Sequence, residues 1–102
     1  MIDQILIQRG KRYGDFEDNA DLSQALKDTM RTAEYWELKP PFIREALDNI
    51  QAKIARMLNG DHLWIDSVTD IIGYATLMKE CIDILNGETN EKEERISEQM
   101  GK

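Results

Sequence analysis

The chain has 102 residues, of which 41% are hydrophobic and 32% are charged, and its formal net charge is −7. This length suits one domain, and the apolar content is enough for a core, so a wholly disordered chain is excluded. The single cysteine and single histidine exclude an internal disulfide, a cysteine-based zinc cluster and any site built on two histidines of one chain.

The charge and hydropathy patterns indicate which partners and which cell compartment to expect. No stretch approaches the roughly 18 consecutive apolar residues that a membrane span needs, so no membrane partner is expected. The N-terminus lacks the order of a signal peptide, and we expect a soluble, cytoplasmic protein. Residues 1–56 carry 9 basic and 10 acidic side chains, whereas residues 57–102 carry 4 and 10. Without a basic stripe, binding to a nucleic-acid duplex is not expected.

The first part of the chain is predicted to form two helices. A short helix is expected from Ile2 to about Gln8, followed by a basic and aromatic turn from Gly10 to Phe16. A second helix is expected over residues 19–36 because apolar residues recur there at helical spacing. Its inward face would consist of Leu22, Ala25, Leu26, Thr29, Ala33 and Trp36.

The third predicted helix is the clearest. The adjacent prolines at 40 and 41 end the preceding element, and Pro41 suits the first turn of a helix, where its missing N–H costs little. The helix is expected to run to about Leu58, since Asn59-Gly60 is a favourable stop. Its apolar stripe would consist of Ile43, Ala46, Leu47, Ile50, Ile54, Met57 and Leu58.

A fourth helix is expected from Asp66 or Ser67, either of which suits an N-cap, to a stop at Asn86-Gly87. Its inward face would consist of Val68, Ile71, Ala75, Met78, Ile82 and Leu85. Residues 88–102 hold five glutamates and little apolar content, which favours a flexible acidic tail or a frayed helix. The predicted fold is all-α: an antiparallel bundle of three long helices plus a short N-terminal helix, one domain over 1–87, with a homodimer or larger oligomer expected.

Acidic residues lie away from the main apolar stripes of the last two helices. On the third helix, Glu45 and Asp48 share a side with the small residues Ala52 and Ala55 and with Arg56. On the fourth helix a second face holds Asp66, Asp70, Gly73, Leu77 and Ile84. A solvated surface rarely holds Gly, Leu and Ile together, so we expect both helices to be covered on two sides. Carboxylates on facing helices are also suitable ligands for Mg²⁺.

These acids carry a resemblance to a known family. The runs Glu45-Ala46-Leu47-Asp48 and Asp66 to Tyr74 look like the two acidic motifs of the MazG-like all-α nucleoside triphosphate pyrophosphatases. Arg44 and Ser67 stand where that family has glutamates. A second resemblance covers more of the chain, and it is to a group of small bacteriophage and prophage proteins of unassigned function. The segments that carry it are residues 12–16, 44–48, 53–56 and 59–61.

The resemblance implies hydrolysis of a nucleoside triphosphate or related nucleotide with Mg²⁺, or with Mn²⁺ in its place. It implies that Glu45, Asp48 and Asp70 are catalytic metal ligands and that Asp66 is an auxiliary metal ligand. Lys53 and Arg56, one or two turns from the acids, would then contact phosphate oxygens. Each of the two also has an ordinary reading as a surface ion-pairing residue.

The basic turn offers a further substrate contact. Lys11, Arg12 and Tyr13 provide two charges and a ring between two glycines, which suits an anion or a base, although such a turn is also an ordinary loop. Two other functions stay open at this point. One is a protein that binds a nucleotide without hydrolysing it. The other is an interaction protein that engages a host protein through its second helix faces and tail.

Overall fold

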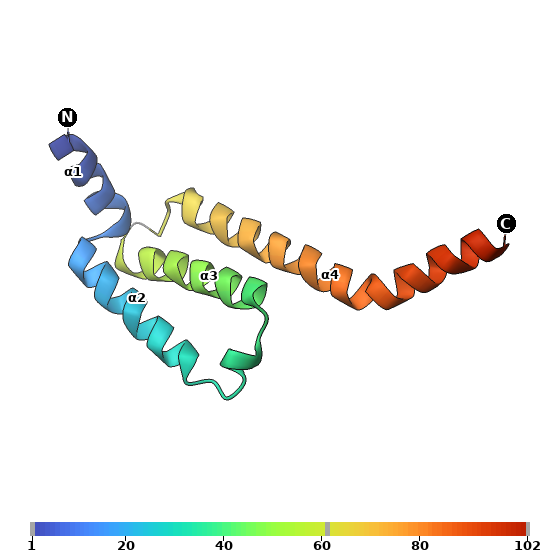
Figure 1. Cartoon of the computed structure of the whole chain (residues 1–102). Coiled ribbons are helices and arrows are strands. Elements are labelled where there is room, and N and C mark those ends of the chain that lie inside the picture. The colour runs from blue at the N-terminus through green and yellow to red at the C-terminus, as the bar shows by residue number, and fades with distance from the viewer. Residues whose placement is uncertain (1, 61, 102) are drawn as a thin grey trace.

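A computed structural model describes residues 2–60 and 62–101, with side chains for all of these except 9–13 and 88–101. No strand occurs among the described residues, and the predicted all-α fold is confirmed. The elements in chain order are α1 (Ile2–Tyr13), α2 (Phe16–Arg31), the short 3₁₀ helix η1 (Trp36–Leu38), α3 (Pro41–Asn59) and α4 (Ile65–Gly101), as Figure 1 shows.

The helix α3 is the centre of the arrangement. It packs against α4 on one side and against α2 on the other, and α4 runs antiparallel to it (Figure 1). The far half of α4 continues past the start of α3, which gives the chain an extended outline of 65 × 33 × 21 Å. Within the described residues, no helix is both long enough and apolar enough to span a bilayer.

The turn between α1 and α2 is shorter than predicted. The helix α1 continues to Tyr13, so the expected end near Gln8 and the expected turn from Gly10 are wrong. Only Gly14 and Asp15 link the two helices, and Gly14 has a φ of +78°, a conformation that residues with a Cβ rarely adopt. A Cβ at this position would also collide with the carbonyl oxygen of Asn59, so the turn is closed against the end of α3.

The helix α2 lies earlier in the chain than predicted. It begins at Phe16 because the Asp15 side chain accepts a hydrogen bond from the N–H of Asp18 at 3.4 Å. It ends at Arg31, where the Thr32 hydroxyl donates to the carbonyl of Thr29 at 2.6 Å and competes with continued helix formation. The expected continuation to Trp36 is therefore wrong, and that residue lies in η1.

The predicted bounds of α3 are nearly correct, whereas those of α4 are not. The stop at Asn59-Gly60 is confirmed, with Gly60 donating its N–H to the carbonyl of Arg56 at 2.9 Å. The helix α4 begins at Ile65, which places both predicted N-caps inside its first turn. It also continues through Asn86-Gly87, because the glycine keeps a negative φ and forms no left-handed cap.

Few side chains are buried in this arrangement. The buried residues of the described part are Trp36, Ala46, Gln51, Ala55 and Ser67. Most of the apolar residues predicted to face inward are half-buried or exposed instead, because each of the outer helices covers only one flank of α3. The most exposed member of the α3 stripe is Leu58, at 69%, and Ile54 is exposed at 40%.

Candidate functional site

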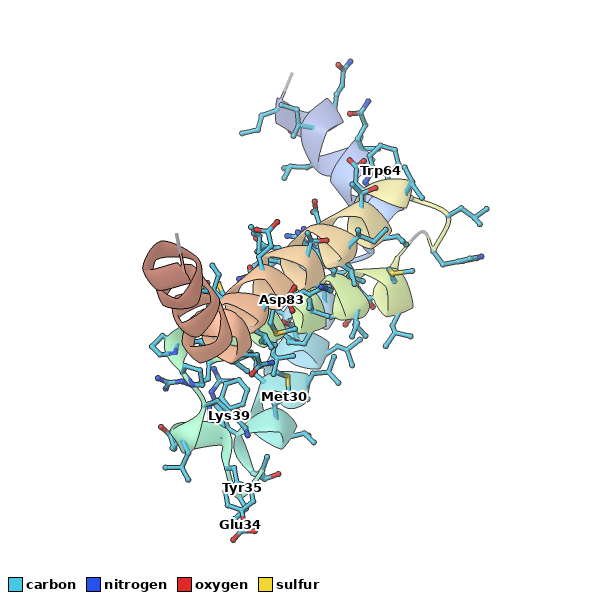
Figure 2. The ribbon with its side chains drawn as sticks, turned by 90° about the vertical axis from the view of Figure 1, so that its right-hand side faces the viewer. Met30, Glu34, Tyr35, Lys39, Trp64 and Asp83 are labelled. Carbon is cyan, nitrogen blue, oxygen red and sulfur yellow. The ribbon has the colours of Figure 1, made fainter. Side chains whose placement is uncertain are left out.

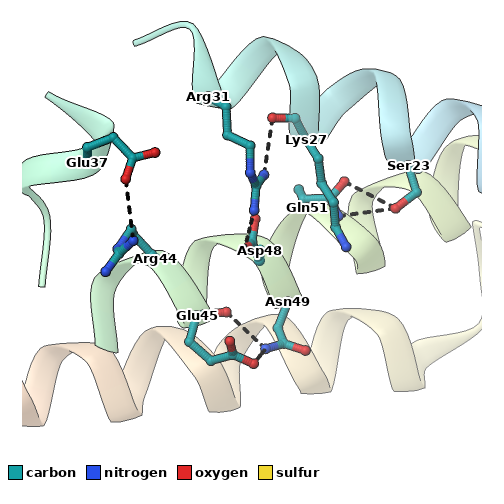
Figure 3. A network of polar contacts seen from close by, with 9 residues as sticks. All are labelled: Ser23, Lys27, Arg31, Glu37, Arg44, Glu45, Asp48, Asn49 and Gln51. Carbon is teal, nitrogen blue, oxygen red and sulfur yellow. Dashed lines mark hydrogen bonds and ion pairs between the residues drawn. The ribbon is translucent and has the colours of Figure 1, made fainter. Parts of the chain in front are cut away.

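Two of the predicted metal ligands lie on α3, and each already has a partner within the chain. Asp48 faces α2, where its Oδ2 lies 2.9 Å from an Nη of Arg31 (Figure 3). Its Oδ1 is buried without a hydrogen-bond partner. Glu45 is exposed and accepts a hydrogen bond from the side-chain amide of Asn49 at 3.0 Å. Each of the two carboxylates is therefore already engaged by a side chain of α2 or α3.

The third predicted catalytic acid is held by a predicted phosphate contact. Asp70 on α4 lies 3.1 Å from the Nζ of Lys53 on α3, and only 14% of the lysine side chain is exposed. This ion pair also shows which side of α3 faces α4. Asp48 lies five residues before Lys53, which is roughly 7.5 Å along the axis and roughly 140° around it. The carboxylates of Asp48 and Asp70 therefore belong to different sides of α3.

The remaining predicted residues do not complete a site. Asp66 is exposed in the first turn of α4, and Arg56 is half-buried in the last turn of α3. Lys11, Arg12 and Tyr13 belong to α1 rather than to a turn, and their side chains lie outside the described residues. No group of three or more His, Cys, Asp or Glu able to hold a metal occurs in the part of the chain searched. Within one chain the predicted ligands do not fit a Mg²⁺ ion.

The contact between α2 and α3 is built from polar side chains and one small residue. Gln51 is 4% exposed, and its amide donates to the hydroxyl of Ser23 at 3.1 Å. Ala55, one turn later, is fully buried, which lets α2 approach closely, as its small size predicted. The Ser23–Gln51 pair was missed because a single polar residue on an otherwise mixed face carries no periodic signal.

An apolar groove opens on the third side of α3. It has a volume of about 520 Å³ and lies between the end of α2, η1 and the middle of α3. Figure 2 shows Met30, Tyr35 and Lys39 gathered at this end of the molecule. Arg31 places its guanidinium 5.0 Å from the ring centre of Trp36, which is one of the lining residues. The apolar lining consists of Met30, Ala33, Trp36, Leu47, Ile50 and Ile54, with Tyr35 at the rim.

A second exposed surface lies on α4, and we call it the outer face of α4. It consists of the five residues predicted to share a face: Asp66, Asp70, Gly73, Leu77 and Ile84. Leu77 is 58% exposed and Ile84 is 62% exposed. A Cβ added to Gly73 would meet nothing within 4 Å. Among the described residues, α3 reaches this face only at Asp70, which pairs with Lys53, and the other four positions are exposed.

The fold and these surfaces define a small all-α protein with uncovered apolar surfaces and without a carboxylate cluster able to hold a metal among its described side chains. No family model, curated protein or solved structure matches the chain.

Proposed function

We propose that this protein is a non-catalytic interaction protein that binds a helical segment of another bacterial protein through the outer face of α4. The observation that carries the proposal is that this face exposes large apolar side chains to solvent. Leu77 and Ile84 are seven residues apart, so they lie on one side of the helix and are both more than half exposed. Aligned exposed apolar residues of this kind mark binding surfaces more often than isolated ones do.

Gly73 supports the same conclusion. A glycine inside a helix costs about 1 kcal/mol relative to alanine, and here no neighbouring atom in the chain requires the missing side chain. A glycine next to the exposed Leu77 on the same face allows the backbone of a second helix to approach closely. The stability that the isolated chain loses at this position is then regained in the complex.

The charges on the same face define the chemistry of the partner. Asp66 and Asp70 lie at its N-terminal end, and the chain as a whole carries a net charge of −7. An amphipathic helix with apolar residues at spacings of three and four, flanked by Lys or Arg, complements this surface. Its association is expected to weaken as salt is added, because exposed charges are screened.

The proposal is tested by affinity enrichment from a bacterial lysate, followed by calorimetry with the recovered protein. Leu77→Glu and Ile84→Glu are expected to abolish recovery of the partner. Ile72→Glu, at a site equally exposed at 62% but roughly 140° around the helix from Leu77, is the matched control and is expected to leave recovery unchanged. If every recovered protein is retained by the two outer-face variants, the proposal is wrong.

The resemblance to the pyrophosphatases supplies a second candidate function, Mg²⁺-dependent hydrolysis of a nucleoside triphosphate. It is favoured by Asp66 and Asp70, which are exposed and lie one turn apart on α4. It requires the Lys53–Asp70 ion pair to open, and it requires carboxylates from beyond one chain. Release of pyrophosphate that disappears in Asp70→Asn and persists in Asp83→Asn would support it. No release from a panel of triphosphates would count against hydrolysis.

A further inference from the structure

The apolar groove is an uncovered feature of the molecule that the proposed function does not use. Its floor is the main apolar stripe of α3, which α2 and α4 cover only in part: Leu47 and Ile50 are half-buried and Ile54 is 40% exposed. The stripe residues Leu47, Ile50 and Ile54 line the groove together with Met30 and Ala33 of the neighbouring segment. In a monomer, these side chains would remain in contact with water.

We propose that a second copy of this chain covers the groove, so that two α3 helices pack against each other across a two-fold axis. This interface is separate from the outer face of α4 and does not rest on the proposed function. The chain would then bury, as a dimer, the apolar stripes that it leaves open as a monomer.

The spacing of the α3 stripe indicates that the groove is occupied by another α3 helix. Spacings of four, three, four and three residues form the seam of a helix that packs against another helix with interdigitating side chains. Such a seam is self-complementary, and two-fold dimers are the commonest oligomers of soluble proteins. The seam consists of Ile43, Leu47, Ile50, Ile54 and Met57.

The exposed area of the chain supports a partner of substantial size. The chain exposes 7966 Å², whereas a compact monomer of 11.8 kDa exposes roughly 5,900 Å². The excess of about 2,000 Å² includes the part of α4 that extends past α3. It is more than twice the roughly 800 Å² that each partner contributes to an interface of standard size. The chain therefore leaves open more surface than one copy contributes to an interface of standard size.

The charges of the groove permit two copies to meet despite the net charge of −7. Only two charged residues line it, Glu34 and Lys39, and they have opposite signs. Both lie at the end of the groove near η1 (Figure 2). A face with no net charge brings two acidic chains together without like-charge repulsion at the contact.

Analytical ultracentrifugation at micromolar concentration tests this proposal on the full chain. The wild-type protein is expected to sediment with twice the 11.8 kDa mass of one chain. Ile54→Glu is expected to halve that mass while the helical signal in circular dichroism is kept, because Ile54 is already 40% exposed in one chain. Leu77→Glu is the matched control, since its site on the outer face of α4 is away from the groove, and it is expected to stay dimeric.

Cross-linking keeps the proposal testable if Ile54→Glu fails to fold. In a chain carrying Cys81→Ser, Ile50→Cys at the centre of the seam is expected to give covalent dimers with a bis-maleimide reagent, and Leu77→Cys is not. A wild-type protein that is monomeric at micromolar concentration overturns the proposal. If that monomer binds a dye that fluoresces on apolar surfaces, the groove is open and has a different occupant. A dimer that Ile54→Glu leaves intact, or that cross-links through Leu77→Cys alone, also overturns it.

Discussion

Replacing Gly73 with alanine separates the stability of this chain from its binding function. The position is in the interior of α4, and the space around the missing Cβ is empty to 4 Å. Alanine therefore adds no steric conflict and restricts the unfolded chain, which stabilises a helix by about 1 kcal/mol. For a domain of this size, that corresponds to a rise in the melting temperature of roughly 4–8 °C.

The assay is urea unfolding followed by circular dichroism at a single chain concentration, because any self-association makes the midpoint depend on concentration. A higher midpoint with an unchanged slope would confirm the gain in stability. The same variant is expected to bind the partner more weakly, since the added methyl group lies where a second helix would approach. If Gly73→Ala lowers the midpoint, an unrecognised contact requires the glycine, and the reasoning from an uncovered face is wrong.

Three further predictions concern the fold. Gly14→Ala is expected to lower the free energy of unfolding by about 2 kcal/mol or more, because Gly14 has a positive φ and an added Cβ would collide with the end of α3. The same urea assay measures this loss, and an unchanged midpoint would contradict the tight turn. Ser23→Ala is expected to cost about 1–3 kcal/mol by leaving the buried Gln51 amide without its partner, and the double variant with Gln51→Leu should recover much of the loss. The hydrogen bond to Asp83 raises the pKa of Lys79 above its ordinary 10.5, so the support that this pair lends α4 is present at neutral pH and is lost as the pH rises through the raised pKa. An NMR titration of Lys79 should show its pKa falling in Asp83→Asn, and an unchanged value would rule out the pairing.

The acidic residues show which features of the candidate site could be predicted from the sequence and which could not. Helical periodicity correctly placed Asp70, Gly73 and Leu77 on one face of α4, because that relation depends only on the geometry of one helix. It did not show that Asp48 pairs with Arg31 of α2, seventeen residues earlier. Pairing across helices depends on the axial register and the rotation of each helix, and neither is contained in the pattern of a single segment.

The sequence by itself determined that this protein is all-α and where α3 begins and ends. The reason is local: Pro41 cannot continue the preceding element and suits a first turn, and Asn59-Gly60 favours a stop. The tertiary structure decided which flank of each helix is covered. The apolar stripe around Ile50 predicted burial, but α2 and α4 pack on the other sides of α3, where the small side chain of Ala55 and the Lys53–Asp70 ion pair allow close approach. Periodicity identifies the residues that avoid water, whereas helix packing in three dimensions determines whether the same chain or another one covers them.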